Sequence, residues 1–298
     1  MRLKGWLIIA LGVILVVAEC SVMLAENSLR ISHRPQPDPS IADRIAAAGG
    51  ASWQTSEVGA VDGIPLRAWL FLPREPNGSA AILLHGVGDS RRGVSSQAVI
   101  LLQHGFTVLA PDSRGHGSSG GSLIGYGVFE ADDVHRWADW LLSGAASARL
   151  YGLGESMGAA ILLESLRVEP RFRAVVAECP FAEFHEVAFD RLHQFSGLPA
   201  FALWPFVTGG EFYARQHYGI DFRQASPEAA VAGTRTPILL IHGERDTNIP
   251  PRHSRELHAV NPQATTVWIV PGATHVAALV AAPEEYARRV VSWFTDHP

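Results

Sequence analysis

The sequence is poor in the residue patterns that several common kinds of site require. Among 298 residues there are only 2 cysteines, Cys20 and Cys179, which cannot form a disulfide framework. The 13 histidines include no His-Glu-x-x-His pair, and no dinucleotide or Walker fingerprint is present, so we expect neither a metal nor a cofactor. The 24 basic residues are outnumbered by 29 acidic ones, and the net charge of −5 disfavours nucleic acid as a partner.

The most informative motif that is present is Gly-Glu-Ser-Met-Gly at residues 154–158. It follows an apolar run, Ala148 to Leu153, and precedes a helix-patterned segment, Ala159 to Leu166. A strand, a sharp turn and a helix in this order are what a nucleophile elbow requires, because the turn presents Ser156 at the carboxyl edge of a sheet. Taken alone, the pentapeptide fits a helix N-cap at Ser156 equally well.

An aspartate and a histidine further along the chain also follow predicted strands. The apolar run Pro237 to Ile241 leads into a glycine-containing loop that ends at Asp246. The run Thr265 to Val270 reads as another strand, and His275 comes shortly after it. Because three required residue types each follow a strand, we select Ser156, Asp246 and His275 as a nucleophile, acid and base.

With these motifs the sequence resembles the α/β-hydrolase superfamily, from about Val58 to the C-terminus, and is most similar to its bacterial esterase, lysophospholipase-like and peptidase-like branch. The chain order Ser, Asp, His is that of the superfamily's triad. The resemblance implies an α/β-hydrolase fold, with a mostly parallel central sheet flanked by helices. Glu178, Glu244 and Asp221 remain alternatives for the acid and rank below Asp246.

A second glycine-rich turn, His85-Gly86-Val87-Gly88-Asp89, follows the strand-like run Ala80 to Leu84. By resemblance this turn is the oxyanion loop of the family. The expected donors are the backbone N–H groups of Val87 and of Met157, the latter at a helix N-terminus. We expect His85 to orient this loop by hydrogen bonding rather than to act as a base.

A third turn, Pro111 to Gly120, resembles one that buttresses the site in many of these hydrolases. Asp112 and His116 within it are interpreted as architecture and not as an acid–base pair.

Alternation of apolar runs with helical patterns predicts one α/β domain over residues 51–298. The strand candidates are Leu66 to Leu72, Ala80 to Leu84, Thr107 to Ala110, Arg149 to Gly152, Ala174 to Ala177, Ile238 to Ile241 and Thr265 to Val270. The helix candidates are Val94 to Gln103, Glu130 to Leu142, Met157 to Arg167, Arg252 to Val260 and Pro283 to Thr295.

The segment at about residues 181–226 breaks this alternation and is rich in aromatic residues. Insertions at this point in the family form caps, so the resemblance implies a helical cap over the site. An aromatic cap would line a pocket for a hydrophobic acyl substrate, although the aromatic residues could equally serve to pack the cap onto the domain.

The N-terminal residues 1–25 read as a membrane anchor or signal segment. Gly5 to Ala18 is uninterrupted by charge and follows Arg2 and Lys4, but it is shorter than the roughly 20 residues that span a bilayer. We favour an uncleaved anchor with the enzyme domain outside the cytoplasm; the alternatives are cleavage to a secreted or periplasmic form, and a cytosolic amphipathic or core helix. Residues 26–50, which contain alternating prolines, are predicted to be an extended linker.

The prediction for function is a serine hydrolase that cleaves a carboxylic ester, thioester or amide through an acyl-enzyme. An acyltransferase would use the same triad. A non-catalytic, membrane-tethered binding protein on a hydrolase scaffold is a further alternative, although such scaffolds usually lose a triad residue and this chain keeps all three.

Overall fold

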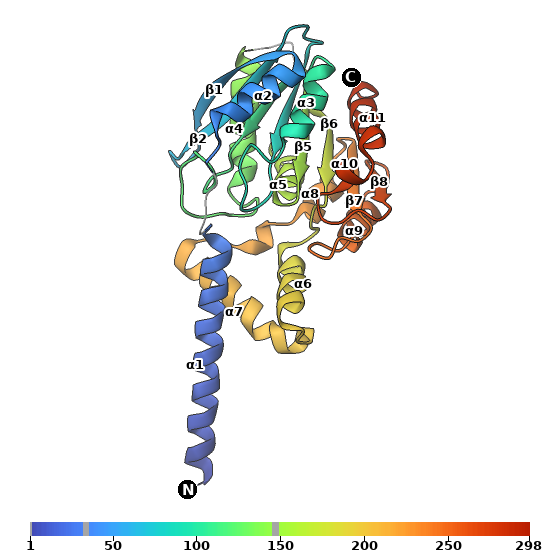
Figure 1. Ribbon diagram of the computed structural model, residues 1–298. Coiled ribbons are helices and arrows are strands. Elements are labelled where there is room, and N and C mark those ends of the chain that lie inside the picture. Colours follow the sequence, from blue (N-terminus) through green and yellow to red (C-terminus); the bar gives the residue numbers. More distant parts are fainter. Residues whose placement is uncertain (1, 32–35, 145–148) are drawn as a thin grey trace.

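The computed structural model describes residues 2–31, 36–144 and 149–298, and its centre is an eight-stranded sheet (Figure 1). The strand order is β1-β2-β4-β3-β5-β6-β7-β8. Strands β1 and β2, and β2 and β4, pair antiparallel, whereas every later pairing is parallel. The strands are β1 (Ala51–Gly59), β2 (Pro65–Pro73), β3 (Ser79–Leu84), β4 (Thr107–Pro111), β5 (Arg149–Glu155), β6 (Phe172–Glu178), β7 (Ile238–Gly243) and β8 (Thr265–Val270).

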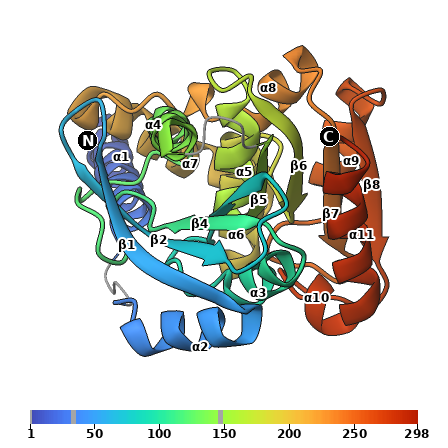
Figure 2. The ribbon, with the colours of Figure 1, turned by 90° about the horizontal axis from the view of Figure 1, so that it is seen from above.

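Helices cover both faces of the sheet, as the view in Figure 2 shows. Those of the body are α2 (Pro39–Gly49), α3 (Ser95–Gln103), α4 (Glu130–Gly144), α5 (Met157–Ser165), α8 (Pro227–Gly233), α9 (Arg252–Val260), α10 (Ala278–Ala281) and α11 (Pro283–Thr295). Successive strand residues point to opposite faces, so Ile82 of β3 joins the core beneath α4 and α5, whereas Leu83 joins the core beneath α3 and α11. Burial on both faces explains why the parallel strands read as continuous apolar runs.

All seven strand candidates and all five helix candidates are confirmed within a few residues at each end. Strand β1 was not predicted, because it lies at the sheet edge and alternates polar with half-buried residues. The prediction of an extended linker over residues 26–50 was wrong at both of its ends. Helix α1 continues to Leu29, and α2 begins at Pro39 with Asp38 as its N-cap; residues 32–35 lie outside the described part.

Two helices in the predicted cap segment and the N-terminal helix project from one end of the body (Figure 1). They are α6 (Phe184–Ser196), α7 (Ala200–Tyr218) and α1 (Arg2–Leu29), and α1 packs along α7. A separate apolar cluster joins them to the body, with Leu29 of α1 fully buried and the rings of Phe184 and Phe222 stacked 4.0 Å apart. This end of the body is also where the parallel strands finish, so the cap lies over the carboxyl edge of the sheet.

Candidate active site

Ser156 occupies the turn between β5 and α5, with φ 54° and ψ −120°. This positive φ is unfavourable for a side chain with a Cβ, and it persists because the surroundings are closely packed. A Cβ on Gly158 would lie 2.4 Å from the Leu84 carbonyl oxygen, and one on Gly154 would lie 2.4 Å from that of Gly158. Both glycines of the motif are therefore required by close backbone approach, and the strained turn expected from the sequence is present.

The three residues selected from the sequence are linked in one chain of hydrogen bonds. His275 Nε2 lies 2.9 Å from Ser156 Oγ, and His275 Nδ1 lies 2.7 Å from Asp246 Oδ2. Since an ionised carboxylate can only accept, Nδ1 carries the proton and Nε2 is left to accept from the serine hydroxyl. The arrangement holds the imidazole in the tautomer that a general base requires.

Asp246 is buried but well supplied with donors. Its Oδ1 accepts from the backbone N–H groups of Asn248 at 2.9 Å and Ile249 at 3.0 Å. Burial opposes its ionisation, but hydrogen bonds from His242 and His275 outweigh burial and hold the pKa of Asp246 well below its usual range. The role of His242 was missed by the sequence analysis, although this residue stands only four positions before Asp246.

The competing acids have other partners. Glu178 accepts from the Ala278 N–H at 3.1 Å and from the Tyr286 hydroxyl at 3.0 Å, and burial raises its pKa. Glu244 accepts from the backbone N–H of Gly272, and Asp221 pairs with Arg223. None of the three carboxylates bonds to His275, so the geometry favours Asp246 as the partner of the imidazole.

Two buried histidines hold the glycine-rich loop above Ser156. His85 Nδ1 donates to the Gly86 carbonyl at 2.8 Å, and His85 Nε2 accepts from the Ser113 N–H at 3.1 Å. His116 Nε2 accepts from the Gly88 N–H at 3.2 Å. Because both imidazoles are tied to backbone groups, they position the loop that carries Val87, in keeping with the orienting role expected for His85.

The turn that contains His116 is itself tied to this loop. Asp112 forms a buried ion pair with Arg91: its Oδ2 accepts from Nε at 3.1 Å and from Nη2 at 2.8 Å, and its Oδ1 accepts from the Arg91 backbone N–H at 2.8 Å. It also accepts from the Ser118 N–H at 2.7 Å. Asp112 thus bonds to backbone and side-chain groups of two neighbouring segments, as its architectural interpretation predicts.

Glu155, the neighbour of Ser156, is buried beside a second carboxylate. Burial, followed by the charges of Glu178 and Asp89, raises the pKa of Glu155 to about 8. Its Oε2 accepts from Gln97 Nε2 at 3.3 Å. At neutral pH the folded protein therefore holds a proton on Glu155 that the unfolded chain releases near pH 4.5.

We expect the Glu155→Gln variant to be more stable than the parent at about pH 8 and closer to it at about pH 5. Between these values the folded state binds more protons than the unfolded state, so rising pH lowers the parent's free energy of unfolding by up to about 1.4 kcal/mol per pH unit. Urea midpoints measured at both pH values check this, with the exposed Glu244→Gln as the control. An equal difference at both pH values would contradict the assignment.

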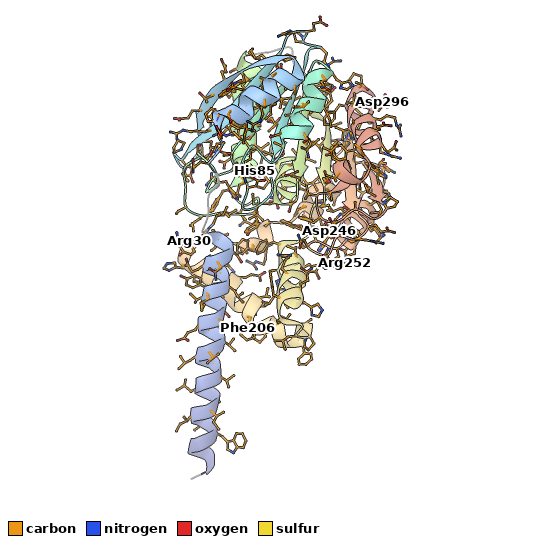
Figure 3. The ribbon with its side chains drawn as sticks, in the orientation of Figure 1. Arg30, His85, Phe206, Asp246, Arg252 and Asp296 are labelled. Carbon is orange, nitrogen blue, oxygen red and sulfur yellow. The ribbon has the colours of Figure 1, made fainter. Side chains whose placement is uncertain are left out.

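A cavity of about 610 Å³ begins at Ser156 and extends between the body, α6, α7 and α1. It falls within the size range of small-molecule sites. Its wall is largely apolar: Leu24, Ala25, Val87, Met157, Phe181, Phe184, Val187, Leu192, Phe195, Phe206, Val207, Phe222 and Ile249 line it. Figure 3 shows Asp246 at the edge of the body that faces the cap, with Phe206 in the cap beyond it.

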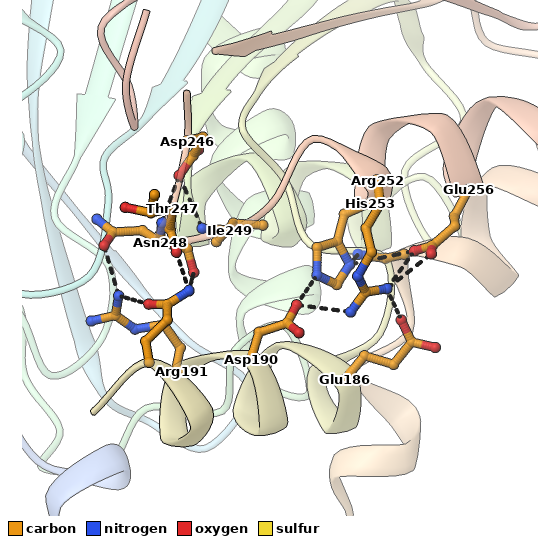
Figure 4. A network of polar contacts seen from close by, with 12 residues as sticks. Glu186, Asp190, Arg191, Asp246, Thr247, Asn248, Ile249, Arg252, His253 and Glu256 are labelled. Atoms are coloured by element: carbon orange, nitrogen blue, oxygen red, sulfur yellow. Dashed lines mark hydrogen bonds and ion pairs between the residues drawn. The ribbon is translucent and has the colours of Figure 1, made fainter. Parts of the chain in front are cut away.

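Polar contacts attach α6 to the loop that carries Asp246 and to α9 (Figure 4). Arg191 Nη1 donates to Asn248 Oδ1 at 2.7 Å, and the Gln194 amide donates to the Thr247 carbonyl. Asp190 accepts from Arg252 at 2.8 Å and from His253 at 2.9 Å. Since the Asn248 N–H also bonds to Asp246, the cap and the acid of the site are held by one network.

Two groups of described residues bring three metal-ligating atoms together, but both are engaged in other bonds. In the group Cys179, His242 and Asp246, the carboxylate bonds to His275 and His242 bonds to the Ile249 carbonyl. In the group Glu186, His253 and Glu256, both carboxylates bind the Arg252 guanidinium, which supplies the positive charge. Neither arrangement offers a set of uncommitted ligands.

A model of the family described as "Alpha/beta hydrolase family" matches residues 81–289 of the 298. The chain belongs to this family. The match includes all three residues of the hydrogen-bonded chain and the cap, and it begins after the two antiparallel strands. The fold predicted from the sequence is therefore confirmed, and the protein is an α/β hydrolase.

Relatives by sequence carry no assigned activity in their descriptions. The uncharacterized protein YqkD of Bacillus subtilis is 29% identical over 239 residues, which are 79% of this chain and 76% of that protein. The uncharacterized protein YfhR of Escherichia coli K12 is 25% identical over 277 residues, covering 90% of this chain and 87% of that protein. Among solved structures, the esterase Pf2001 of Pyrococcus furiosus superposes with a TM-score of 0.72 and 23% identity, covering 89% of this chain and 98% of that one.

Proposed function

We propose that this hydrolase cleaves a carboxylic ester of a hydrophobic acid through an acyl-enzyme on Ser156. The observation that carries the proposal is the pair of contacts from His275, 2.9 Å to the serine hydroxyl and 2.7 Å to the Asp246 carboxylate. His275 takes the hydroxyl proton as Ser156 attacks the acyl carbon, and gives it to the departing alcohol. It then removes a proton from the water that releases the acid and regenerates the serine.

Negative charge that develops on the acyl oxygen needs donors close to Ser156. Met157 is the first residue of α5, so its N–H has no partner within the helix and lies at the positive end of the helix dipole. Val87 lies in the loop that passes over the nucleophile, where a Cβ on Gly86 would be 3.4 Å from Ser156 Cβ. The Val87 and Met157 amides are the oxyanion donors in this mechanism, and both residues line the cavity.

The preference for a hydrophobic acyl group follows from the cavity. Its apolar wall begins beside Ser156 and continues between the cap helices, which offers an extended acyl chain a path away from the reacting carbon. Thioesters and amides share the same acyl chemistry and become the preferred substrates if esters are not cleaved. Transfer of the acyl group to an alcohol or amine would appear as a second product when such an acceptor is added.

The N-terminal helix is part of this proposal as an uncleaved membrane anchor. Within the described residues, Trp6–Leu29 is long and apolar enough to cross a membrane. Leu24 and Ala25 line the cavity, and the Ser28 carbonyl accepts from the Tyr126 hydroxyl at 2.9 Å, so cleavage after Ala25 would remove part of the cavity wall. The placement of the catalytic domain outside the cytoplasm rests on Arg2 and Lys4 at the start of the helix.

The test is hydrolysis of a p-nitrophenyl ester series, from acetate to palmitate, by the full chain in detergent. Because α1 forms part of the cavity wall, a truncated body is not an adequate substitute. We expect activity to rise with acyl length and then to decline when the chain exceeds the cavity. A flat series would contradict the acyl-pocket assignment. If no ester is cleaved by the folded protein, the same series of thioesters and amides decides between another hydrolase and a non-catalytic binding protein.

A further inference from the structure

The end of the cap that lies furthest from the body exposes aromatic side chains. Phe195 is 79% exposed, Phe201 82% and Trp204 60%. With Leu198 these residues surround the turn between α6 and α7, and we call the four of them the cap tip. Isolated exposed apolar residues are ordinary, but such a group at one end of a molecule indicates a surface that another apolar phase covers.

The apolar part of α1 emerges on the same side of the body as the cap tip (Figure 1). From Trp6 to Val16 its large apolar side chains are exposed, which a helix surrounded by water would not sustain. The α6–α7 turn lies level with a point part-way along α1, below the level where α1 enters the body. The exposed apolar surfaces of α1 and of the cap tip therefore lie on the same side of the body.

The contact between α1 and α7 fixes their relative depth. Ser21 Oγ lies 3.4 Å from the Pro205 carbonyl, and a Cβ on Gly209 would lie 2.5 Å from that hydroxyl. Further toward the body, the Tyr213 hydroxyl donates to the Glu26 carboxylate at 2.8 Å. The two helices are thus packed side by side from Ser21 to Glu26 of α1, with small residues where they approach most closely.

The length of α1 places this contact inside a bilayer. A hydrocarbon core of about 30 Å needs about 20 helical residues at roughly 1.5 Å each. Counted from Trp6, that length ends at Ala25, and the next residue is Glu26, which also accepts from the Arg30 guanidinium at 2.8 Å. If only the exposed part of α1 that precedes Glu19 were embedded, it would be shorter than the roughly 20 residues that span a bilayer.

The part of α7 beside Ser21 consequently lies below the membrane surface. Phe201 and Trp204 precede Pro205 on α7, so they lie still further from the body and deeper in the bilayer. Phe195 of the cap tip is both exposed and part of the cavity wall, which means that the cavity reaches the surface at this depth. Leu24 of α1 lines the same cavity from the other side.

From the depth of α7 relative to α1 we propose that the cap tip is embedded in the leaflet next to the catalytic body. We propose also that the cavity takes the acyl chain of a lipid directly from that leaflet. The occupant of the exposed surface is the bilayer itself. The lipid substrate deepens the proposed function and rests on it, whereas the insertion of the cap tip rests only on α1 and α7. An acyl chain would enter beside Phe195 and place its carboxyl carbon at Ser156.

Insertion is tested by a fluorescent probe on the full chain in phosphatidylcholine nanodiscs. In a Cys20→Ser background, Phe201→Cys is labelled with an environment-sensitive nitrobenzoxadiazole dye; Cys179 is buried and stays unlabelled. We expect blue-shifted emission that brominated lipids quench. Asp296→Cys, on the opposite side of the body, is the control and should show neither effect (Figure 3). A probe at Phe201 that lipid does not quench overturns the insertion, whether water or a second copy of the chain surrounds it.

The lipid source is tested with Phe201→Ser combined with Trp204→Ser, two exposed residues that do not line the cavity. In nanodiscs this variant should hydrolyse p-nitrophenyl acetate at the parent's rate and a long-chain monoacylglycerol in the bilayer about tenfold more slowly. Val61→Ser, a change at an exposed residue of the body, should alter neither rate. Equal loss on both substrates, or loss on neither, overturns direct uptake from the leaflet.

The two proposals fail in different ways. If neither substrate is hydrolysed by the parent but the probe at Phe201 is quenched by lipid, the proposed function fails and the insertion stands. If the parent hydrolyses p-nitrophenyl acetate and the probe is not quenched, the function stands and the insertion fails.

Discussion

Replacement of Ser156 by alanine should abolish ester hydrolysis and leave the fold intact. In a serine protease with the same triad, loss of the nucleophile lowers kcat by on the order of 10⁶. The change removes one oxygen from a buried turn in which the backbone is fixed by Gly154 and Gly158, so the elbow does not depend on the hydroxyl. Initial rates on the preferred p-nitrophenyl ester and a thermal melt of the same sample check both parts.

The matched control for this change is Ser165→Ala. Ser165 is buried on α5, and its hydroxyl donates only to the Leu162 carbonyl at 2.7 Å, so the variant loses the same atoms without touching the triad. It should keep the parent's rate within a few-fold. Full activity of the Ser156 variant with a parental melt would remove Ser156 as the nucleophile.

Replacement of Asp246 by asparagine should lower kcat by about 10⁴, the loss measured for the corresponding change in a well-studied triad. The geometry gives the reason. The backbone N–H groups of Asn248 and Ile249 hold one oxygen of the side chain, so an asparagine would keep its carbonyl there and turn its amide toward His275. A donor facing Nδ1 forces the proton onto Nε2, which then cannot accept from Ser156.

Glu178→Gln is the comparison that decides which acid is used. Glu178 is buried beside the same strand ends, but its oxygens accept from the Ala278 N–H and the Tyr286 hydroxyl. Because burial raises its pKa, the neutral glutamine should be tolerated and the rate should change by less than about tenfold. If Glu178→Gln lost activity and Asp246→Asn kept it, the acid would have to be reassigned. The kcat values of both variants on the preferred p-nitrophenyl ester check this comparison.

Much of the candidate site was accessible from the sequence because its residues stand at strand ends. Asp246 and His275 each follow an apolar run, and the carboxyl ends of parallel strands meet at one edge of a sheet. The elbow was readable for a similar reason, since two glycines with a serine between them mark a close backbone approach. The continuous apolar runs of the strands and the hydrophobic periodicity of the helices predicted the fold.

Sequence reasoning missed or misinterpreted the elements that lack a strong hydrophobic periodicity. Strand β1 is held at the edge by its register with β2, and half of its residues face solvent. Helix α2 was hidden by the prolines before it, although Pro39 stands at its first turn, where proline is well tolerated. His242 has no distinguishing spacing, and its contact with Asp246 depends on the curvature of one loop.

The residues of the candidate site lie in short local segments, namely the turn that holds Ser156 and the loops that hold Asp246 and His275, and each segment is placed by the strand before it. These local segments do not specify which helices that lie far apart in the sequence pack against one another. Glu26 and Tyr213 stand 187 residues apart, yet their contact holds α1 against α7, and α1 thereby contributes Leu24 and Ala25 to the cavity wall. Such contacts depend on the shapes of packed helices and not on any periodic signal along the chain, so only the tertiary structure could supply them.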